Sequence, residues 1–300
     1  MPIDVRERLD AATVEAVLRL ADSAAGADGV YPLSEHIVLH LRHGGDAAVR
    51  HLLAVESGEL AGYAHVDVSD QVEGASAELA VDPSWRRRGV GRALVEAAVA
   101  ASPDGRLRLW SHGEHPAAAA LARSLGFERA RVLLQLRRPF GAPIPEPHFP
   151  DGVVLRPFRP DHDEAAWIAV NARAFAHHPD QGSWTAHDLK IREGEPWFDP
   201  AGFLLAERDG ELLGFHWTKV HGAGTHEHER IGEVYVLGVD PSAQGLGLGR
   251  ALTLAGLRYL QGLGLAQAML YVDESNRGAV ALYTGLGFER WATDVSFRKA

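Results

Sequence analysis

The chain carries one series of sequence motifs twice, and this duplication restricts its fold more than any other feature. In the first half, Leu-Ala-Val-Asp-Pro at 79–83 precedes a glycine-containing loop and an apolar segment, and Leu-Gly-Phe-Glu-Arg follows at 125–129. In the second half, Leu-Gly-Val-Asp-Pro at 237–241 and Leu-Gly-Phe-Glu-Arg at 286–290 occur in the same order. A repeat of this length is a duplicated domain, because solenoid units span only about 20 to 50 residues.

The junction between the two copies is rich in proline. Prolines recur at short intervals between Arg138 and Pro147. Because proline lacks a backbone N–H and fixes φ, this segment cannot continue a helix and favours an extended connector. We therefore predict an N-terminal domain over 1–140, a proline-rich linker over 141–151 and a C-terminal domain over 152–300.

Apolar periodicity predicts alternating strands and helices within each copy. In the first copy, apolar side chains recur at helical spacing from Val90 to Ala98. A Gly-Glu turn at 58–59 between two apolar runs is typical of a hairpin of antiparallel strands. We expect strands over 51–55, 61–68, 76–81, 107–110 and 130–136, and helices over 89–101 and 116–125. Each copy is thus predicted to be an α/β domain with a mixed sheet.

The composition excludes several classes of function. The 300 residues include no cysteine, which rules out disulfides, thiol nucleophiles and iron–sulfur ligation. A formal net charge of −10 argues against nucleic acid as the main partner. No apolar run reaches the roughly 20 residues that span a bilayer, and the N-terminus lacks an apolar signal core. We expect a monomeric cytoplasmic protein that binds neither nucleic acid nor membrane.

The segment after each Asp-Pro pair has the composition of an anion-binding loop. It reads Arg-Arg-Arg-Gly-Val-Gly-Arg-Ala at 86–93 and Gln-Gly-Leu-Gly-Leu-Gly-Arg-Ala at 244–251. Glycines let backbone N–H groups approach an anion closely, and the helix that follows adds a positive partial charge at its N-terminus. No Gly-Lys-Ser/Thr follows, so this is not a P-loop, and the three preceding strands do not fit a Rossmann βαβ unit. We expect a pyrophosphate cradle in each copy.

These loops, together with the downstream Leu-Gly-Phe, resemble the acetyl-CoA signature of the GNAT superfamily of N-acetyltransferases. The matching segments are Arg86–Gly91 and Gln244–Gly249. The resemblance implies acetyl-CoA as co-substrate and a mixed sheet whose fourth and fifth strands splay apart to admit the pantetheine arm. It also implies direct attack of an amine on the thioester, with no acyl-enzyme and no metal.

The last helix of the second copy carries a tyrosine that the first copy lacks. When Phe127 is aligned on Phe288, Tyr283 corresponds to Ala122. The resemblance implies that this tyrosine protonates the departing CoA thiolate, a task that suits a phenolic hydroxyl.

The fourth strand of the second copy carries a glutamate. When Val81 is aligned on Val239, Glu233 corresponds to Ala75. Period-2 alternation predicts that Glu233, Tyr235 and Leu237 share one face of the sheet. A carboxylate there is suited to accept the ammonium proton of the substrate, directly or through water. We therefore predict that Glu233 and Tyr283 are catalytic, and that the first copy binds CoA or supports the site without catalysing the reaction.

A closer resemblance joins the chain to tandem members of the superfamily. It rests on residues 174–182, 232–241 and 270–276. It implies that the acceptor is the cysteinyl amine of cysteinyl-glucosaminyl-inositol. The substrate contacts that it implies are Glu35, Asp180, Lys219, Glu233 and Tyr271. The CoA contacts that it implies are Leu79, Ala80, Val81, Arg87, Arg88, Gly89, Val90, Gly91, Arg92, Leu237, Gly238, Val239, Gln244, Gly245, Leu246, Gly247, Leu248, Gly249, Arg250, Asn276, Arg277, Gly278, Ala279, Val280 and Ala281.

Two alternative functions remain open from the sequence. The acceptor is another small amine, such as an aminoglycoside, a polyamine or a protein N-terminus, or the chain is a catalytically silent CoA-binding protein. The presence of both Glu233 and Tyr283 argues against a silent binder. The segment His-Glu-His-Glu at 226–229 is interpreted as a solvated loop rather than a metal site, because a metal site needs further ligands and supporting groups.

Overall fold

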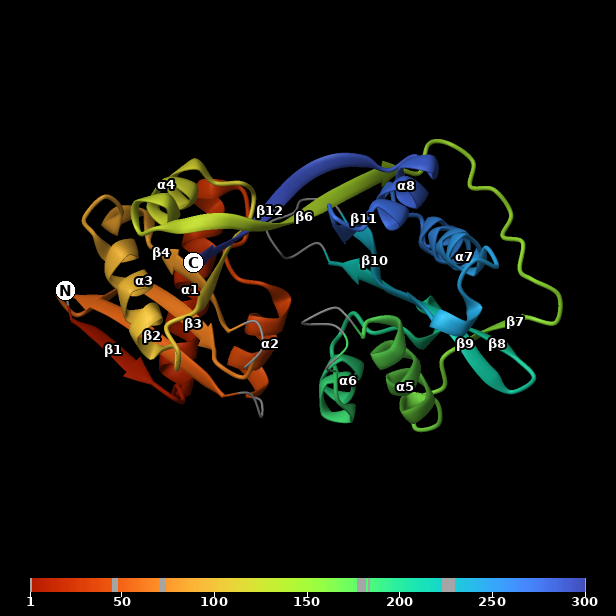
Figure 1. Ribbon diagram of the computed structural model, residues 1–300, viewed down its shortest axis with the longest axis horizontal. Helices are drawn as coiled ribbons and strands as arrows, with labels where there is room; N and C mark the ends of the chain where they lie inside the picture. The colour runs from red at the N-terminus through yellow and green to blue at the C-terminus, as the bar shows by residue number, and fades with distance from the viewer. Residues whose placement is uncertain are drawn as a thin grey trace. The chain divides into compact units, whose positions relative to one another are not determined.

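The computed structural model describes residues 2–44, 48–70, 74–176, 182, 184–222 and 230–299. The chain divides into two compact units (Figure 1). Unit 1 comprises residues 1–134, 273–275 and 292–300, and unit 2 comprises residues 135–272 and 276–291.

Unit 1 is an α/β unit with one mixed sheet. Strands β1 to β4 are antiparallel neighbours, β4 and β5 are parallel, and the last part of β12 pairs antiparallel with β5. Its elements are β1 (Ile3–Arg6), α1 (Ala11–Asp28), α2 (Glu35–His43), β2 (Val49–Glu56), β3 (Glu59–Asp67), β4 (Ala75–Val81), the 3-10 turn η1 (Pro83–Trp85), α3 (Val90–Ala101), β5 (Leu107–Ser111), α4 (Pro116–Ser124) and the first part of β6 (Phe127–Pro139).

Unit 2 repeats this order of elements. Strands β7 to β10 are antiparallel neighbours, and β10 and β11 are parallel. Its elements are β7 (Val154–Pro157), α5 (Glu164–Ala174), α6 (Ala186–Glu193), η2 (Pro200–Gly202), β8 (Phe203–Arg208), β9 (Glu211–His221), β10 (Ile231–Val239), η3 (Pro241–Ala243), α7 (Leu248–Gly262), β11 (Gln267–Asp273), α8 (Arg277–Gly285) and the start of β12 (Glu289–Lys299). The predicted α/β class with a mixed sheet in each copy is confirmed.

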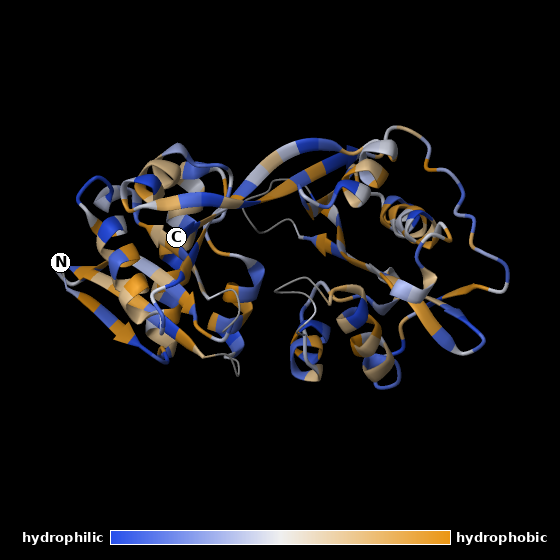
Figure 2. Ribbon diagram, in the orientation of Figure 1, coloured by the Kyte–Doolittle hydropathy of each residue, from blue (hydrophilic) through white to orange (hydrophobic). Residues whose placement is uncertain are grey.

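In unit 1, alternate residues of the central strands pack against helices on opposite faces of the sheet. Leu52 lies in a core cluster with Leu94 of α3, whereas its neighbour Leu53 lies in a cluster with Val17 of α1 and Ile37 of α2. Figure 2 shows the hydrophobic colouring of β2 and β3 between these helices. Period-2 alternation therefore gives the sheet two buried faces.

The parallel pair at the centre of each unit is short. In unit 1, Ala75–Ala77 pairs with Leu107–Leu109, and in unit 2, Gly232–Val234 pairs with Ala268–Leu270. In both units the fourth strand continues for several described residues beyond this ladder without pairing with the fifth. The two strands thus separate at the point where the sequence resemblance implies that pantetheine enters.

Candidate active site

The predicted pyrophosphate loops have the same backbone conformation in the two units. The aspartates Asp82 and Asp240 each accept a hydrogen bond of 2.9 Å from the backbone N–H two residues later, which starts a 3-10 turn. Gly89 and Gly247 are the N-caps of α3 and α7, with φ of +88° and +79°. No side chain of the described residues caps either helix. The N–H groups of the first turn can therefore donate hydrogen bonds to an anion.

One loop position differs in residue type but not in conformation. Gly245 has a φ of +80°, and Arg87, its counterpart, adopts a φ of +62°. A non-glycine residue in this left-handed region costs about 1 to 2 kcal/mol. The loop of unit 1 therefore has the same left-handed backbone conformation at this position as that of unit 2, although arginine disfavours it.

The arginines of the first loop have different partners. Arg86 forms a bidentate ion pair with Asp28 of α1, at 2.7 and 2.9 Å, and so fastens the loop to that helix. Arg88 lies over the Trp85 ring, and Arg92 donates to the Ser124 hydroxyl at 2.9 Å. In unit 2, Arg250 and Arg277 are exposed. Backbone groups therefore dominate the second cradle, while side chains reinforce the first.

The other predicted CoA contacts lie at the two strand ends and at α8. Residues 79–81 and 237–239 are the last residues of β4 and β10, beyond the parallel ladders. Asn276 is the N-cap of α8, and its side-chain oxygen accepts from the Ala279 N–H at 3.1 Å. Residues 277–281 form the first turns of this helix. The CoA assignments to all these residues stay predictions.

A buried cluster of charged and aromatic side chains lies on the α6-facing side of β9 and β10 in unit 2. Glu233 and Lys219 are cross-strand partners and are only 6% and 7% exposed. The Lys219 ammonium lies 4.6 Å from the centre of the Trp197 ring and 5.3 Å from that of Tyr235. Arg192 of α6 donates to the Tyr235 hydroxyl at 2.8 Å. The cluster offers an acceptor for an ammonium group beside a wall of aromatic rings.

β10 contains a bulge in this cluster, between Val234 and Val236. The bulge inserts Tyr235 as one extra residue relative to β9. It overturns the predicted common face, because Leu237 packs with Leu248 in the cluster beneath α7 whereas Tyr235 packs with the aromatic cluster beneath α5.

The same bulge corrects the predicted correspondence between the two copies. Gly232 is the first residue of the parallel ladder in unit 2, as Ala75 is in unit 1. Glu233 therefore corresponds to Ser76 and not to Ala75. The alignment from Val239 was wrong by one residue because it crossed the bulge. Unit 1 still lacks a carboxylate at this position.

Tyr283 lies on α8 and is 7% exposed, with its ring 5.8 Å from that of Phe288. Burial raises the pKa of the Tyr283 hydroxyl to about 12. The hydroxyl is thus protonated at neutral pH, as a proton donor to a leaving group must be.

The remaining predicted substrate contacts are spread over the chain. Tyr271, on β11, is 42% exposed, and its hydroxyl accepts a hydrogen bond of 2.8 Å from the Gln135 amide. Glu35 is the half-buried first residue of α2 in unit 1. Asp180 lies outside the described residues, as does the segment 226–229. Of the five predicted contacts, the structure places Lys219 and Glu233 side by side in unit 2. The roles of all five residues stay predictions.

Unit 1 contains an ion-pair network that the sequence analysis missed. His112, directly after β5, lies 3.2 Å from Glu78 on β4 and 2.9 Å from Asp294 on β12. Burial opposes protonation of this imidazole, but the two carboxylates outweigh it and raise its pKa to about 10. The protonated imidazole joins β4 to β5 beyond their ladder. These residues are far apart in the sequence, so no local sequence pattern predicts the network.

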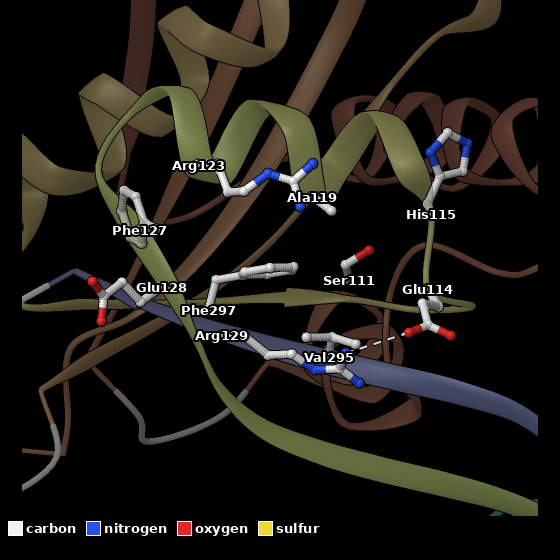
Figure 3. Close-up of a pocket in the computed structure, with 10 residues that line it drawn as sticks. All are labelled: Ser111, Glu114, His115, Ala119, Arg123, Phe127, Glu128, Arg129, Val295 and Phe297. Carbon is white, nitrogen blue, oxygen red and sulfur yellow. Dashed lines mark ion pairs between the residues drawn. The ribbon is translucent and has the colours of Figure 1, made fainter.

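A pocket of about 490 Å³ lies in unit 1, between α4 and the strands β5, β6 and β12 (Figure 3). Phe127 and Phe297 form its apolar part, and Glu114 and Arg129 form an ion pair of 3.5 Å at its edge. None of the predicted site residues lines it. The described residues contain no group of three or more His, Cys, Asp or Glu side chains placed to hold a metal, and no helix among them is long and apolar enough to span a membrane.

Comparison with known proteins points to one kind of enzyme. Residues 159–288 match the acetyltransferase (GNAT) family, and residues 47–129 match an acetyltransferase (GNAT) domain. A mycothiol acetyltransferase from Acidothermus cellulolyticus is 58% identical, over 99% of this chain and 94% of the relative. One from Thermobispora bispora is 55% identical over 100% of both chains.

Solved structures share the two-unit fold. A tandem GNAT protein from the clavulanic acid biosynthesis pathway superposes with a TM-score of 0.74 over 99% of this chain and 98% of that one, at 22% identity. A GCN5-related N-acetyltransferase from Sphaerobacter thermophilus gives a TM-score of 0.69 over 99% and 95%, at 24% identity. At such identities the likeness shows the fold alone.

Proposed function

The chain belongs to the mycothiol acetyltransferases of the GNAT superfamily, and on that premise we propose that it acetylates the cysteinyl amine of cysteinyl-glucosaminyl-inositol to form mycothiol. This reaction is the last step of mycothiol biosynthesis. The acetyl donor is acetyl-CoA, and the proposal assigns the enzyme to the cytoplasm as a monomer that needs neither nucleic acid nor membrane. One observation carries the proposal for the site: the buried pair of Glu233 and Lys219 at the bulge of β10, where unit 1 has Ser76 and Asp67.

The first step is deprotonation of the substrate ammonium. An α-amino group has a pKa of about 8, so an amine at neutral pH is mostly protonated and cannot attack. The Glu233 carboxylate accepts this proton, directly or through one water. Because Glu233 is only 6% exposed, solvent screens its charge less than that of a surface carboxylate.

The second step is acyl transfer. The amine nitrogen attacks the thioester carbonyl carbon, the C–N bond forms, and the C–S bond of the tetrahedral intermediate breaks. The departing CoA sulfur takes the proton of the Tyr283 hydroxyl. The nitrogen loses its second proton to solvent, and solvent returns a proton to the Tyr283 oxygen and removes the one held by Glu233. Burial keeps this hydroxyl protonated throughout the neutral pH range, so a proton is available at each turnover.

We assign the remaining contacts according to their chemistry. Lys219 and Tyr271 donate to oxygens of the polyhydroxylated acceptor, while Glu35 and Asp180 accept from its hydroxyls. Asn276 and the first turns of α8 face CoA in unit 2 together with the loop 244–250, and the loop 87–92 holds a CoA molecule in unit 1.

Unit 1 is assigned a supporting role. It has Ala122 in place of the tyrosine and Ser76 in place of the glutamate. The protonated His112 joins Glu78 to Asp294 in the region where β4 and β5 separate, so this region already holds a fixed charge network. These features favour binding or stability over catalysis.

The test is release of free CoA on mixing the protein with acetyl-CoA and cysteinyl-glucosaminyl-inositol, beside a panel of other amines under the same conditions. We expect a clear preference for the cysteinyl pseudodisaccharide. Turnover of another amine alone would keep the reaction but refute the acceptor. Binding of CoA without turnover of any amine would favour a catalytically silent protein.

A further inference from the structure

Glu233 has a hydrogen-bond partner that the sequence analysis did not single out. His221, the last residue of β9, places its Nε2 atom 2.8 Å from the Glu233 Oε2 atom. The His221 side chain is 24% exposed, whereas that of Glu233 is 8% exposed. The imidazole thus stands between the buried carboxylate and the more open end of β9.

The strand register explains this contact. Glu233 is the cross-strand partner of Lys219, and His221 lies two residues further along β9, on the same face. Among the residues that the structure describes, Glu233 on β10 and Lys219 on β9 share this face with His221, and Arg192 of α6 donates to Tyr235 of the same cluster. His221 and Lys219 therefore flank the carboxylate from one strand.

From this geometry we propose that His221 is a positioning residue, which orients the Glu233 carboxylate for the substrate amine. The inference rests on the proposed function, in which Glu233 accepts the ammonium proton. An ionised carboxylate only accepts hydrogen bonds, so the 2.8 Å contact has the His221 Nε2–H donating to Oε2. This bond fixes the plane of the carboxylate and leaves Oε1 for the substrate.

The two groups that flank the carboxylate make different contacts. His221 donates a hydrogen bond to it, and a bond to a charged acceptor is stronger than one to a neutral acceptor. Lys219 acts differently, because its ammonium lies over the Trp197 and Tyr235 rings. Of these two contacts, the one from His221 orients the carboxylate, and the one from Lys219 holds its ammonium on the aromatic rings.

Unit 1 has nothing comparable at this position among its described residues. The counterpart of Lys219 is Asp67, which ends β3, and two residues further on stands Ser69. The Ser69 N–H donates to the Asp67 carboxylate. The imidazole and the carboxylate are therefore both features of unit 2, as expected of groups that work as a pair.

The test compares four variants with the wild type: His221→Ala, His221→Gln, Glu233→Gln and the double variant H221A/E233Q. The matched control is His162→Ala, an exposed histidine in the same unit. The measurements are kcat for CoA release with the cysteinyl substrate and KM for both acetyl-CoA and that substrate, all at neutral pH.

We expect H221A to lower kcat about tenfold, the lower end of what loss of a hydrogen bond to a charged group costs, with KM for acetyl-CoA unchanged. H221Q restores most of kcat, since its amide still donates. In the E233Q background, H221A has no further effect, because His221 acts through Glu233.

Wild-type rates in H221A, or an equal loss from H221A with and without Glu233, would overturn the inference. An H221Q as slow as H221A would also overturn it. The proposed function is tested separately by the wild type: if that protein fails to acetylate the cysteinyl substrate, the function is wrong, whereas an active wild type with unaffected His221 variants refutes only the role of His221.

Discussion

Units 1 and 2 share one order of elements, one pair of left-handed loop positions and one short parallel ladder, but they differ along the strand beside that ladder. In unit 2, β10 has a bulge and carries the buried Glu233, whose cross-strand partner on β9 is Lys219. In unit 1, β4 is regular, and Ser76 and Asp67 stand at the matching positions. On the proposed function, the shared scaffold is thus separable from the side chains that we assign to proton transfer.

The largest effect is expected from removal of the base. Glu233→Gln should lower kcat by about 10² to 10⁴, the usual contribution of a positioned general base, while KM for acetyl-CoA changes little. The control is Ser76→Ala, the matching change in unit 1, for which we expect wild-type kinetics. A steady-state assay of CoA release measures kcat for both variants. Equal losses of kcat in the two variants would contradict the proposed difference between the units.

Removal of the acid should have a somewhat smaller effect. Tyr283→Phe keeps the ring packed on Phe288 but lacks the hydroxyl, so kcat should fall about 10²-fold. Because the pKa of Tyr283 is raised to about 12, the wild type should show no basic limb from this residue below about pH 10. A pH–rate profile checks both statements, and a basic limb that disappears in Y283F would show that the hydroxyl titrates lower than burial indicates.

The ion-pair network of unit 1 should affect stability and not catalysis. His112→Gln leaves the buried carboxylates of Glu78 and Asp294 without their shared cation, which should lower the free energy of unfolding by about 3 kcal/mol. The folded-state pKa of His112 is raised to about 10, above the ordinary value near 6.5. Its stabilisation is therefore complete below about pH 6.5 and disappears as the pH rises towards about 10.

Denaturant unfolding of H112Q and the wild type at about pH 6, 8 and 10 measures this dependence. The gap between the two proteins should narrow with rising pH, and kcat should be unchanged in the variant. A gap that is constant over this range would mean that His112 stabilises by packing alone.

The smallest effect is expected at the loop glycine. Gly247 has a φ of +79° and open space where a β-carbon would stand, so Gly247→Ala adds backbone strain without a clash. At about 1 to 2 kcal/mol, this strain should raise KM for acetyl-CoA about tenfold. Arg87→Gly makes the opposite change in unit 1, and we expect it to leave catalysis untouched. If R87G changed KM for acetyl-CoA more than G247A does, the loop of unit 1 and not that of unit 2 would bind the acetyl-CoA that reacts.

Local patterns predicted the fold well. The repeated Asp-Pro turns and Leu-Gly-Phe motifs fixed the order of elements, and the helical spacing from Val90 matches α3, Val90–Ala101. Tyr283 and Ala122 are buried on the corresponding helices α8 and α4, because no insertion separates them from the aligned Phe288 and Phe127.

What the sequence could not predict depends on inserted residues or on long-range pairing. A bulge adds one residue to a strand without changing its composition, so alternation from Glu233 misplaced Leu237. The pairing of Val295 with Ser111 joins the end of the chain to unit 1, and nothing in the apolar pattern of β12 indicates which strand it pairs with. His221 was missed because its partner Glu233 lies on the next strand and not at a local motif spacing.

We propose that acetyl transfer takes place in unit 2. The most direct measurement is the single-turnover release of CoA, from acetyl-CoA and cysteinyl-glucosaminyl-inositol, by the double variant Glu233→Gln with Tyr283→Phe, in which unit 1 is intact. We expect this variant to release CoA at least about 10²-fold more slowly than the wild type. A rate within about tenfold of the wild type would show that these two residues of unit 2 do not carry the chemistry.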